Sequence, residues 1–269
     1  MAGGPFLVLL AWSEWVVIMG TALGTMLIST PQPVIKGVIQ QVLAVPKPNP
    51  FQAALYLEVL KLLYELFQTA RREGLVAIEG HIERPEESAI FKRYPPVLAH
   101  HHAVAFLCDS LRLVLVGSVP PHDLEQLMDA EIDVHHEEAA KPVAALQRVG
   151  DGLPGIGIVA AVLGIVVTMQ SINGPVEEIG HHVAAALVGT FLGVLLSYGF
   201  VGPIASNIEG RNSDESRFYQ VIKSGVVAFA KGMPPLVAAE FGRKAISGHD
   251  RPTFAAMETA CKSVPGKGG

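Results

Sequence analysis

The stretch DGLPGIGIVAAVLGIVVTM, residues 151–169, decides the fold of this 269-residue chain. It belongs to a run without Asp, Glu, Lys or Arg that extends over residues 152–176. The run is longer than the roughly 20 residues that a helix needs to cross the hydrocarbon core of a membrane. A second such run covers residues 179–208 and is interrupted only by His181 and His182. The two runs predict two membrane-spanning helices.

The whole composition agrees with a membrane protein, because half of the residues are apolar, only 17% are charged and the mean hydropathy is positive. A third candidate span is FLVLLAWSEWVVIMGTALGTMLI, residues 6–28, whose two tryptophans suit an interfacial belt. Glu14 interrupts this third run, so a buried core helix is the alternative. No basic segment precedes it, and we therefore expect a retained span rather than a cleaved signal peptide.

The distribution of lysine and arginine orients the chain. Neither residue occurs in residues 1–30 or 154–204, whereas eleven lie in residues 31–153 and nine in residues 205–269. All twenty lie on one side if residues 173–181 form a short external hairpin, and the positive-inside rule makes that side the cytoplasm. The segments that carry lysine and arginine are therefore expected to face the cytoplasm.

We therefore predict an all-α membrane protein with three transmembrane helices and a helical cytoplasmic domain. Its segments are an N-terminal transmembrane helix (1–30), a cytoplasmic helical domain (31–150), a transmembrane helix pair with a short periplasmic hairpin (151–204) and a cytoplasmic C-terminal helical region (205–269). Residues 51–74 illustrate the helical pattern. Their apolar residues recur every three or four positions, and the segment ends in Arg71, Arg72 and Gly74.

Several kinds of chemistry are not indicated. The sequence has no glycine-rich phosphate loop, zincin helix or nucleophile elbow, so we expect neither an enzyme nor a bound cofactor. Histidines cluster at residues 100–102, 135–136 and 181–182, but adjacent helical residues diverge, which favours solvated or hydrogen-bonded histidines over a metal site. Cys108 and Cys261 predict reduced thiols, and the net charge of −5 does not favour nucleic-acid binding.

The two later spans lack an ionisable group at membrane depth, where ion-moving proteins normally keep one. If the protein moves ions, we expect the carboxylate to come from another chain. Pro154 and Pro203 lie at similar depth in the antiparallel pair, and each removes a backbone donor and leaves a carbonyl unpaired. Each proline either simply marks the end of a helix, as prolines commonly do, or forms part of a hinge or gate.

Several segments together resemble the MotA family, the membrane stator subunits of the bacterial flagellar motor, within the MotA/TolQ/ExbB proton channel superfamily. The match covers nearly the whole chain. The segments that carry it are GDGLPGIGIVAAVLGIVVT (150–168), VGTFLGVLLSYGFVGPIA (188–205), PPLVAAEFGRK (234–244), LLYELFQTARREGLVAIEGHIERPEESAIFKRYP (62–95) and LMDAEIDVHHEEAAKPVAALQRVGD (127–151).

The resemblance implies roles for particular residues on the cytoplasmic side. Arg71 and Glu79 match the charged pair that the family uses to press on the rotor protein FliG, and Glu131 matches a third cytoplasmic charge linked to motor function.

In the spans, the resemblance implies that Pro154 and Pro203 couple ion passage to movement and that Thr190 is a hydroxyl beside the ion path. Sodium-driven relatives place a threonine seven residues after the first proline, where this chain has Ala161. Alanine offers no oxygen to a cation, so we expect the transported ion to be H⁺.

The resemblance also implies a location in the bacterial inner membrane, partners and an assembly. Five subunits surround a dimer of a MotB-type protein whose aspartate receives the ion, within the lipid bilayer. Family members carry four spans, and we expect the first of them to be missing from this chain. Two alternatives remain: an ExbB/TolQ-type energy-transducing channel subunit, and a non-conducting membrane scaffold.

Overall fold

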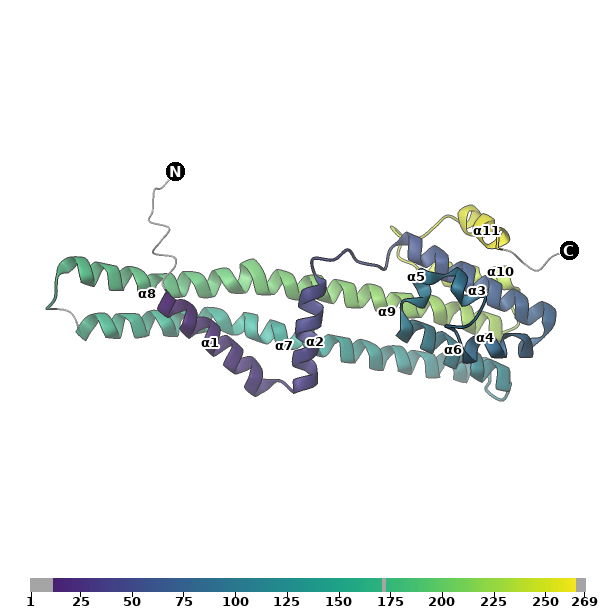
Figure 1. The fold of residues 1–269 in the computed structure, drawn as a ribbon, viewed down its shortest axis with the longest axis horizontal. Helices are drawn as coiled ribbons and strands as arrows, with labels where there is room; N and C mark the ends of the chain where they lie inside the picture. The colour runs from purple at the N-terminus through teal and green to yellow at the C-terminus, as the bar shows by residue number, and fades with distance from the viewer. Residues whose placement is uncertain (1–11, 171–172, 265–269) are drawn as a thin grey trace. The chain divides into compact units, whose positions relative to one another are not determined.

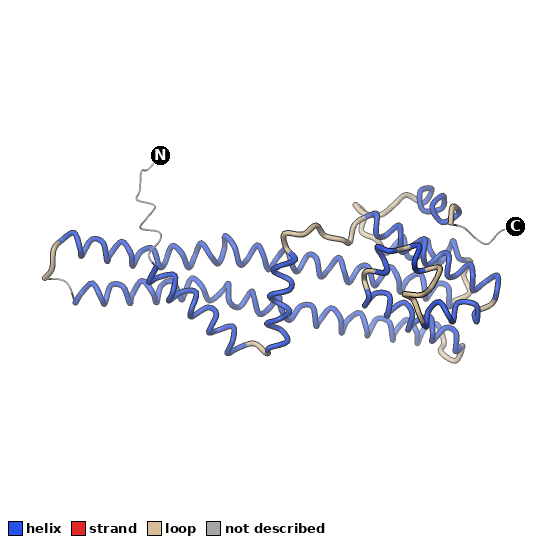
Figure 2. The backbone as a smooth tube through the Cα atoms, viewed as in Figure 1, coloured by secondary structure: helices blue, strands red, loops and turns tan. Residues whose placement is uncertain are grey.

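The computed structural model describes residues 12–170 and 173–264. Within these residues all regular secondary structure is helical (Figures 1 and 2), which confirms the all-α fold class. The chain forms two compact units. The first unit comprises residues up to Lys47 together with Glu138–Gly210, and the second unit comprises Pro48–Glu137 together with residues from Arg211 onward.

The units divide the chain at other positions than the four predicted segments do. Helix α7 runs without a break from Pro121 to Gln170, so residue 150, where the predicted cytoplasmic domain ends, lies inside a helix. Likewise residue 205 lies inside α9 (Gly202–Ala230). The start of the apolar run at residue 152 is therefore not the start of a helix, because α7 begins thirty-one residues earlier, at Pro121.

The first unit is built from helices that are largely apolar. They are α1 (Trp12–Ser29), α2 (Gln32–Ala44), the second part of α7, α8 (Val176–Leu196), the π-helix η4 (Ser197–Val201) and the first residues of α9. Two stretches are long and apolar enough to cross a membrane, one within Pro121–Gln170 and one within Ile179–Ala230. The described part of α1 is not among them, and its predicted span begins at residue 6, outside the described residues. The number of three spans stays a prediction.

Helices α7 and α8 approach closely because glycines face each other across their contact. A Cβ atom on Gly157 would lie 2.7 Å from the carbonyl oxygen of Gly189, and one on Gly193 would lie 2.6 Å from that of Leu153. Neither position has room for a side chain. The glycines therefore act in packing within one chain, as small residues do between membrane helices.

The second unit is a helical domain in which α3 occupies the core. Its elements are α3 (Ala53–Glu73), the 3₁₀-helix η2 (Leu75–Ile78), α4 (Glu79–Glu83), the 3₁₀-helix η3 (Phe91–Arg93), α5 (Pro95–Leu98), α6 (His101–Val116), the first part of α7, most of α9, α10 (Pro235–Ala245) and α11 (Phe254–Lys262). The helix predicted over residues 51–74 is confirmed. Its expected apolar face is buried throughout, at Leu55, Val59, Leu62, Leu63, Leu66 and Phe67.

A buried polar cluster fixes the loop after α4 to the core of the second unit. Glu65 on α3 is only 5% exposed. The hydroxyl of Tyr94 donates a hydrogen bond of 2.7 Å to its Oε2 atom, and the guanidinium of Arg93 forms an ion pair with its Oε1 atom. Both polar atoms of the carboxylate are thus paired, as burial of a charge requires.

Candidate functional site

Arg71 lies in the last turn of α3, where the chain reverses direction. Gly74 follows the helix with φ of +93°, a conformation that L residues with a side chain rarely adopt. The reversal leads through η2 directly to Glu79, the first residue of α4. The structure thus places Arg71 and Glu79 on two successive elements, and both side chains are exposed.

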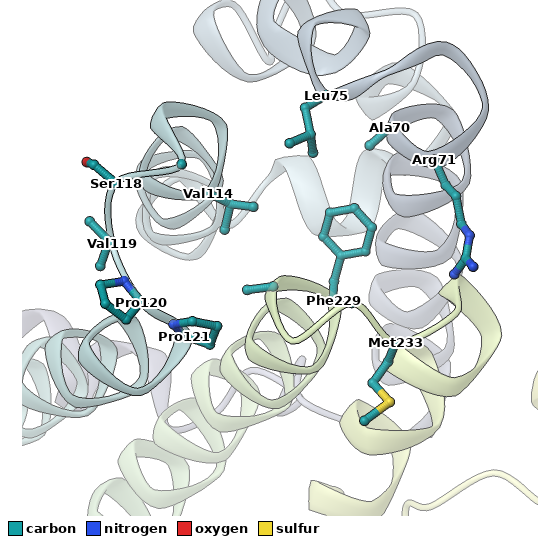
Figure 3. A pocket seen from close by; sticks show the side chains of 13 residues that line it. Ala70, Arg71, Leu75, Val114, Ser118, Val119, Pro120, Pro121, Phe229 and Met233 are labelled. Carbon is teal, nitrogen blue, oxygen red and sulfur yellow. The ribbon is translucent and has the colours of Figure 1, made fainter.

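A cavity of about 590 Å³ lies beside Arg71 in the second unit (Figure 3). Its walls come from the end of α3, the turn between α6 and α7, and the end of α9. Arg71 is the single charged residue among those that line it, and the main apolar contributions come from Leu75, Val114, Val119, Phe229 and Met233. Phe229 is held in place by parallel stacking on Phe67, with ring centroids 4.4 Å apart.

Sequence reasoning missed this cavity. The two turns that border the cavity do carry sequence signals. Gly117 and Gly232, which adopt positive φ, lie in these turns, and Pro120 and Pro121 stand at the start of α7. These residues mark turns, as glycine and proline usually do. That the two turns meet beside Arg71 depends on tertiary packing, which local sequence does not encode.

Glu131 is placed apart from the pair. It lies ten residues beyond Pro121 along α7, which corresponds to about 15 Å of helix. Partial shielding from water raises the pKa of its carboxyl above the ordinary value, and the neighbouring carboxylate of Asp109 raises it further. The structure therefore places Arg71 and Glu79 on successive elements and groups Glu131 with Asp109.

In the first unit, Pro154 lies inside α7 and removes the donor that would pair with the carbonyl of Gly150. Gly150 itself packs against η4, because a Cβ atom there would lie 3.0 Å from the Val201 side chain. Val201 is two residues before Pro203. The carbonyl that Pro154 leaves without a helical partner thus lies at the level of the second proline.

Pro203 follows the π-helix η4 without an intervening loop. The N–H of Gly202 bonds to the carbonyl of Ser197, a five-residue spacing that widens the helix just before the proline. Helical structure continues on both sides of Pro203, as it does around Pro154. Neither proline ends a helical run. The choice between ordinary helix-end prolines and a hinge or gate stays a prediction.

Ala161 and Thr190 both lie at the close contact between α7 and α8, and both are half-buried. A Cβ atom on Gly189 would lie 3.4 Å from the Ala161 nitrogen, and one on Gly157 would lie 3.3 Å from the Thr190 Cα. The structure thus brings together two of the residues expected beside the ion path. It adds Glu14 of α1, whose Oε2 atom would lie 2.8 Å from a Cβ on Gly189.

Other candidate groups form no site. Among the described residues, no cluster of three or more His, Cys, Asp and Glu side chains could hold a metal ion. His135 lies 3.8 Å from Glu215 and 3.4 Å from the hydroxyl of Tyr219, so this histidine has polar neighbours within the protein. Cys108 and Cys261 are free and buried, and burial raises the pKa of both thiols to about 12.

Comparison with known families places the chain in a class. Residues 1–74 match the family model "Motility protein A N-terminal", and residues 99–220 match "MotA/TolQ/ExbB proton channel family". The second match includes α6, α7 and α8 with both long apolar stretches. The two matched models together indicate a class of membrane proteins that contains motility protein A and the MotA/TolQ/ExbB proton channels.

Individual relatives refine this class. The chain is 37% identical to motility protein A of Escherichia coli (strain K12) over 98% of its length and 90% of the relative's. It is 39% identical to the chemotaxis protein LafT of Vibrio parahaemolyticus, over 96% of its length and 90% of the relative's. The chain therefore belongs to the motility protein A family.

Two solved structures share the fold. The C. jejuni MotAB structure superposes with a TM-score of 0.74 at 20% identity, covering 91% of this chain and 88% of the other. The flagellar MotAB stator complex from Bacillus subtilis superposes with a TM-score of 0.72 at 24% identity, covering 89% and 86%. The chain thus shares its fold with chains of these two structures.

Proposed function

We propose that the chain is a stator subunit of the bacterial flagellar motor, and that with a MotB-type partner it forms a proton channel whose flow drives rotation. The observation that carries this proposal is its membership of the motility protein A family over nearly its full length. The two solved MotAB structures with the same fold provide the model for the partner.

In this function the chain supplies the walls of the path and the partner supplies the aspartate that receives the ion. Between Pro154 and Gln170 on α7, and between Val183 and Leu196 on α8, no residue is ionisable. An ion that binds to the partner's aspartate neutralises it and lowers the free energy of burying it among these apolar helices. The preferred packing of the two chains then changes.

The prolines are where such a change can be absorbed. Pro154 leaves a carbonyl unpaired within α7, and Pro203 follows a π-helical turn. The regular backbone hydrogen bonding is therefore interrupted in both helices, at positions that lie opposite each other. We infer that these two points bend when the ion binds and leaves. Thr190 lies beside the path, and Ala161 offers no oxygen, which supports protons as the transported ion.

The second unit contacts the rotor in this proposal. Arg71 and Glu79 are exposed charges without an ion-pair partner among the described residues, so they are available to charges of opposite sign on a FliG-type protein. Glu131 is a weaker candidate because of its distance along α7. The second unit is then cytoplasmic, and five subunits surround a partner dimer in the inner membrane.

A conduction assay tests the channel. The chain is co-expressed with a MotB-type protein that carries a membrane aspartate and lacks its plug, and the uptake of protons by the cells is followed. We expect acidification that disappears when the partner's aspartate is replaced by asparagine. A complex that assembles yet passes no protons would identify the chain as a non-conducting scaffold. Swimming that follows external sodium and ignores proton uncouplers would exclude protons as the ion.

A further inference from the structure

The carboxyl group of Glu14 is buried inside the first unit without a complete set of partners. Glu14 is only 7% exposed. Its Oε2 atom makes no hydrogen bond to any described residue. Buried polar atoms are nearly always paired, so an unpaired carboxyl oxygen in such a place calls for a ligand or a proton.

The position of this oxygen is defined by a glycine of α8. A Cβ atom on Gly189 would come within 2.8 Å of Oε2, so any other residue at position 189 would displace the carboxyl group. The same Cβ would lie 3.3 Å from the Ala160 side chain and 3.4 Å from the Ala161 nitrogen. Three helices, α1, α7 and α8, therefore meet around the Glu14 carboxyl.

The stretches of these helices that lie beside Glu14 carry no counter-charge. Glu14 is the only ionisable residue between Trp12 and Ser29, and the facing stretches of α7 and α8 contain none between Pro154 and Gln170 or between Val183 and Leu196. An ionised carboxylate in a place without water or a cation is strongly disfavoured. The arrangement is therefore suited to a carboxyl group that carries a proton.

The carboxyl also lies close to Ala161 and Thr190, the residues expected beside the ion path. Ala161 is adjacent to Gly189 across the helix contact, and Thr190 is the next residue of α8. Sequence reasoning treated Glu14 only as an interruption of an apolar run and expected every carboxylate of the path to come from another chain. The structure instead places one carboxyl of this chain beside the residues expected to line the path.

We propose that Glu14 is a second proton-binding residue of the channel, acting in series with the partner's aspartate. A proton bound at Glu14 passes to that aspartate, and Glu14 then takes another proton from water that enters the path. This inference rests on the proposed channel function, because the aspartate belongs to the partner.

Conduction by substituted complexes tests the inference. Glu14→Gln keeps the size of the side chain and its ability to form hydrogen bonds but cannot exchange a proton. With the full chain and a plug-free MotB-type partner, we expect Glu14→Gln to lower proton uptake by at least about tenfold, in the range of lost proton transfer. Glu14→Asp retains a carboxyl group and is expected to keep a measurable part of the flux.

Assembly is measured on the same membranes, by the amount of partner that co-purifies with the chain. We expect wild-type recovery for Glu14→Gln. If Glu14→Gln conducts as the wild type does, the carboxyl carries no proton and the inference is wrong. If instead the partner is lost from both Glu14→Gln and Glu14→Asp, Glu14 serves packing, and the inference is equally wrong.

An infrared difference spectrum gives a readout independent of conduction. The carbonyl stretch of a protonated carboxyl group should be present in the wild-type complex and absent from Glu14→Gln, with a shift in D₂O. An unchanged spectrum would overturn the inference. If the wild-type complex does not conduct, the proposed channel function itself is wrong. If wild type and Glu14→Gln both conduct equally, only the role of Glu14 is wrong.

A pair of glycine substitutions provides a matched control on α8. Gly189→Ala places a Cβ against the Glu14 carboxyl and is expected to reduce proton uptake. Gly180→Ala adds the same atom where nothing lies within 4 Å, and is expected to leave uptake unchanged. Equal uptake by the two variants would contradict the placement of Glu14 beside Gly189.

Discussion

The two units of the chain use opposite means to hold helices together. The second unit has a large core around α3 and closes it with paired charges such as Glu65 with Arg93. The first unit has only small buried clusters, and its helices approach through glycines. Large apolar side chains remain exposed along α7 and α8, for example Val159, Leu163 and Leu187. A surface of that kind suits contact with lipid or with other chains.

Removing the buried carboxylate of the second unit should have the largest effect on stability. Glu65→Ala leaves Arg93 without its ion pair and Tyr94 without its acceptor, and we expect a loss of about 2–3 kcal/mol in the free energy of unfolding. Denaturant unfolding of the complex in detergent measures it. Tyr94→Phe removes a single hydrogen bond and should lower the stability by only about 1 kcal/mol. Equal effects of the two variants would show that the ion pair contributes nothing.

In the first unit, stability is tested by adding a methyl group at the contact between α7 and α8. Gly193→Ala places a Cβ 2.6 Å from the carbonyl oxygen of Leu153, which forces α7 and α8 apart. Such overpacking is expected to lower stability by about 1–3 kcal/mol, measured as the thermal midpoint of the purified complex.

Gly155→Ala is the control for this change, because nothing lies within 4 Å of a Cβ at that position of α7. Alanine favours a helix over glycine by about 1 kcal/mol, so this variant should keep or raise the midpoint. A lowered midpoint in both variants would mean that the helix contact is not what the glycines serve.

A pH effect of smaller size is expected in the second unit. Burial lowers the pKa of His100, which packs on Phe51 with ring centroids 5.1 Å apart, although the carboxylate of Glu215 opposes the shift. Because the folded protein favours the neutral ring, its contribution is present above the ordinary pKa of about 6.5 and is lost as the pH falls below it.

His100→Gln should remove this part of the pH dependence, amounting to less than about 1 kcal/mol between pH 7 and pH 5. The exposed neighbour variant His101→Gln serves as the control. Urea midpoints of the complex at several pH values provide the measurement, and identical pH slopes for wild type and His100→Gln would refute the assignment.

The exposed charges should have the smallest effect on folding and a large one on function. The combination of Arg71→Glu and Glu79→Lys changes no buried contact, and we expect a stability change below about 0.5 kcal/mol. In the proposed function it reverses both charges toward the rotor, so torque at high load should fall. Tethered-cell measurements test this, with Arg72→Glu on the same helix end as the control. Unchanged torque would refute the rotor contact at these residues.

The sequence predicted well what depends on local pattern. The apolar spacing along α3 identified its buried face at every position named, and the runs without charge identified the apolar parts of α7 and α8. The segment boundary predicted between residues 150 and 151 lies inside a continuous helix, because a proline removes one hydrogen bond without ending a helix whose neighbours support it.

What the sequence could not predict depends on residues that lie far apart along the chain. Glu14 and Gly189 meet only because α1 packs on α8, and Phe229 reaches the Arg71 cavity only because α9 ends beside α3. The π-helical turn before Pro203 is likewise a result of packing, since no residue preference marks it. The candidate sites were therefore predicted as separate residues, and their surroundings required the structure.

The burial of both cysteines has a practical consequence for labelling. Cys108 and Cys261 are at most 3% exposed, and their thiols stay protonated at neutral pH, whereas the thiolate is the reactive form. A cysteine introduced at an exposed position such as Glu79 will therefore react with a maleimide dye before either native thiol. Fluorophores can be attached for single-molecule work on the wild-type background, without first removing the native cysteines from the core.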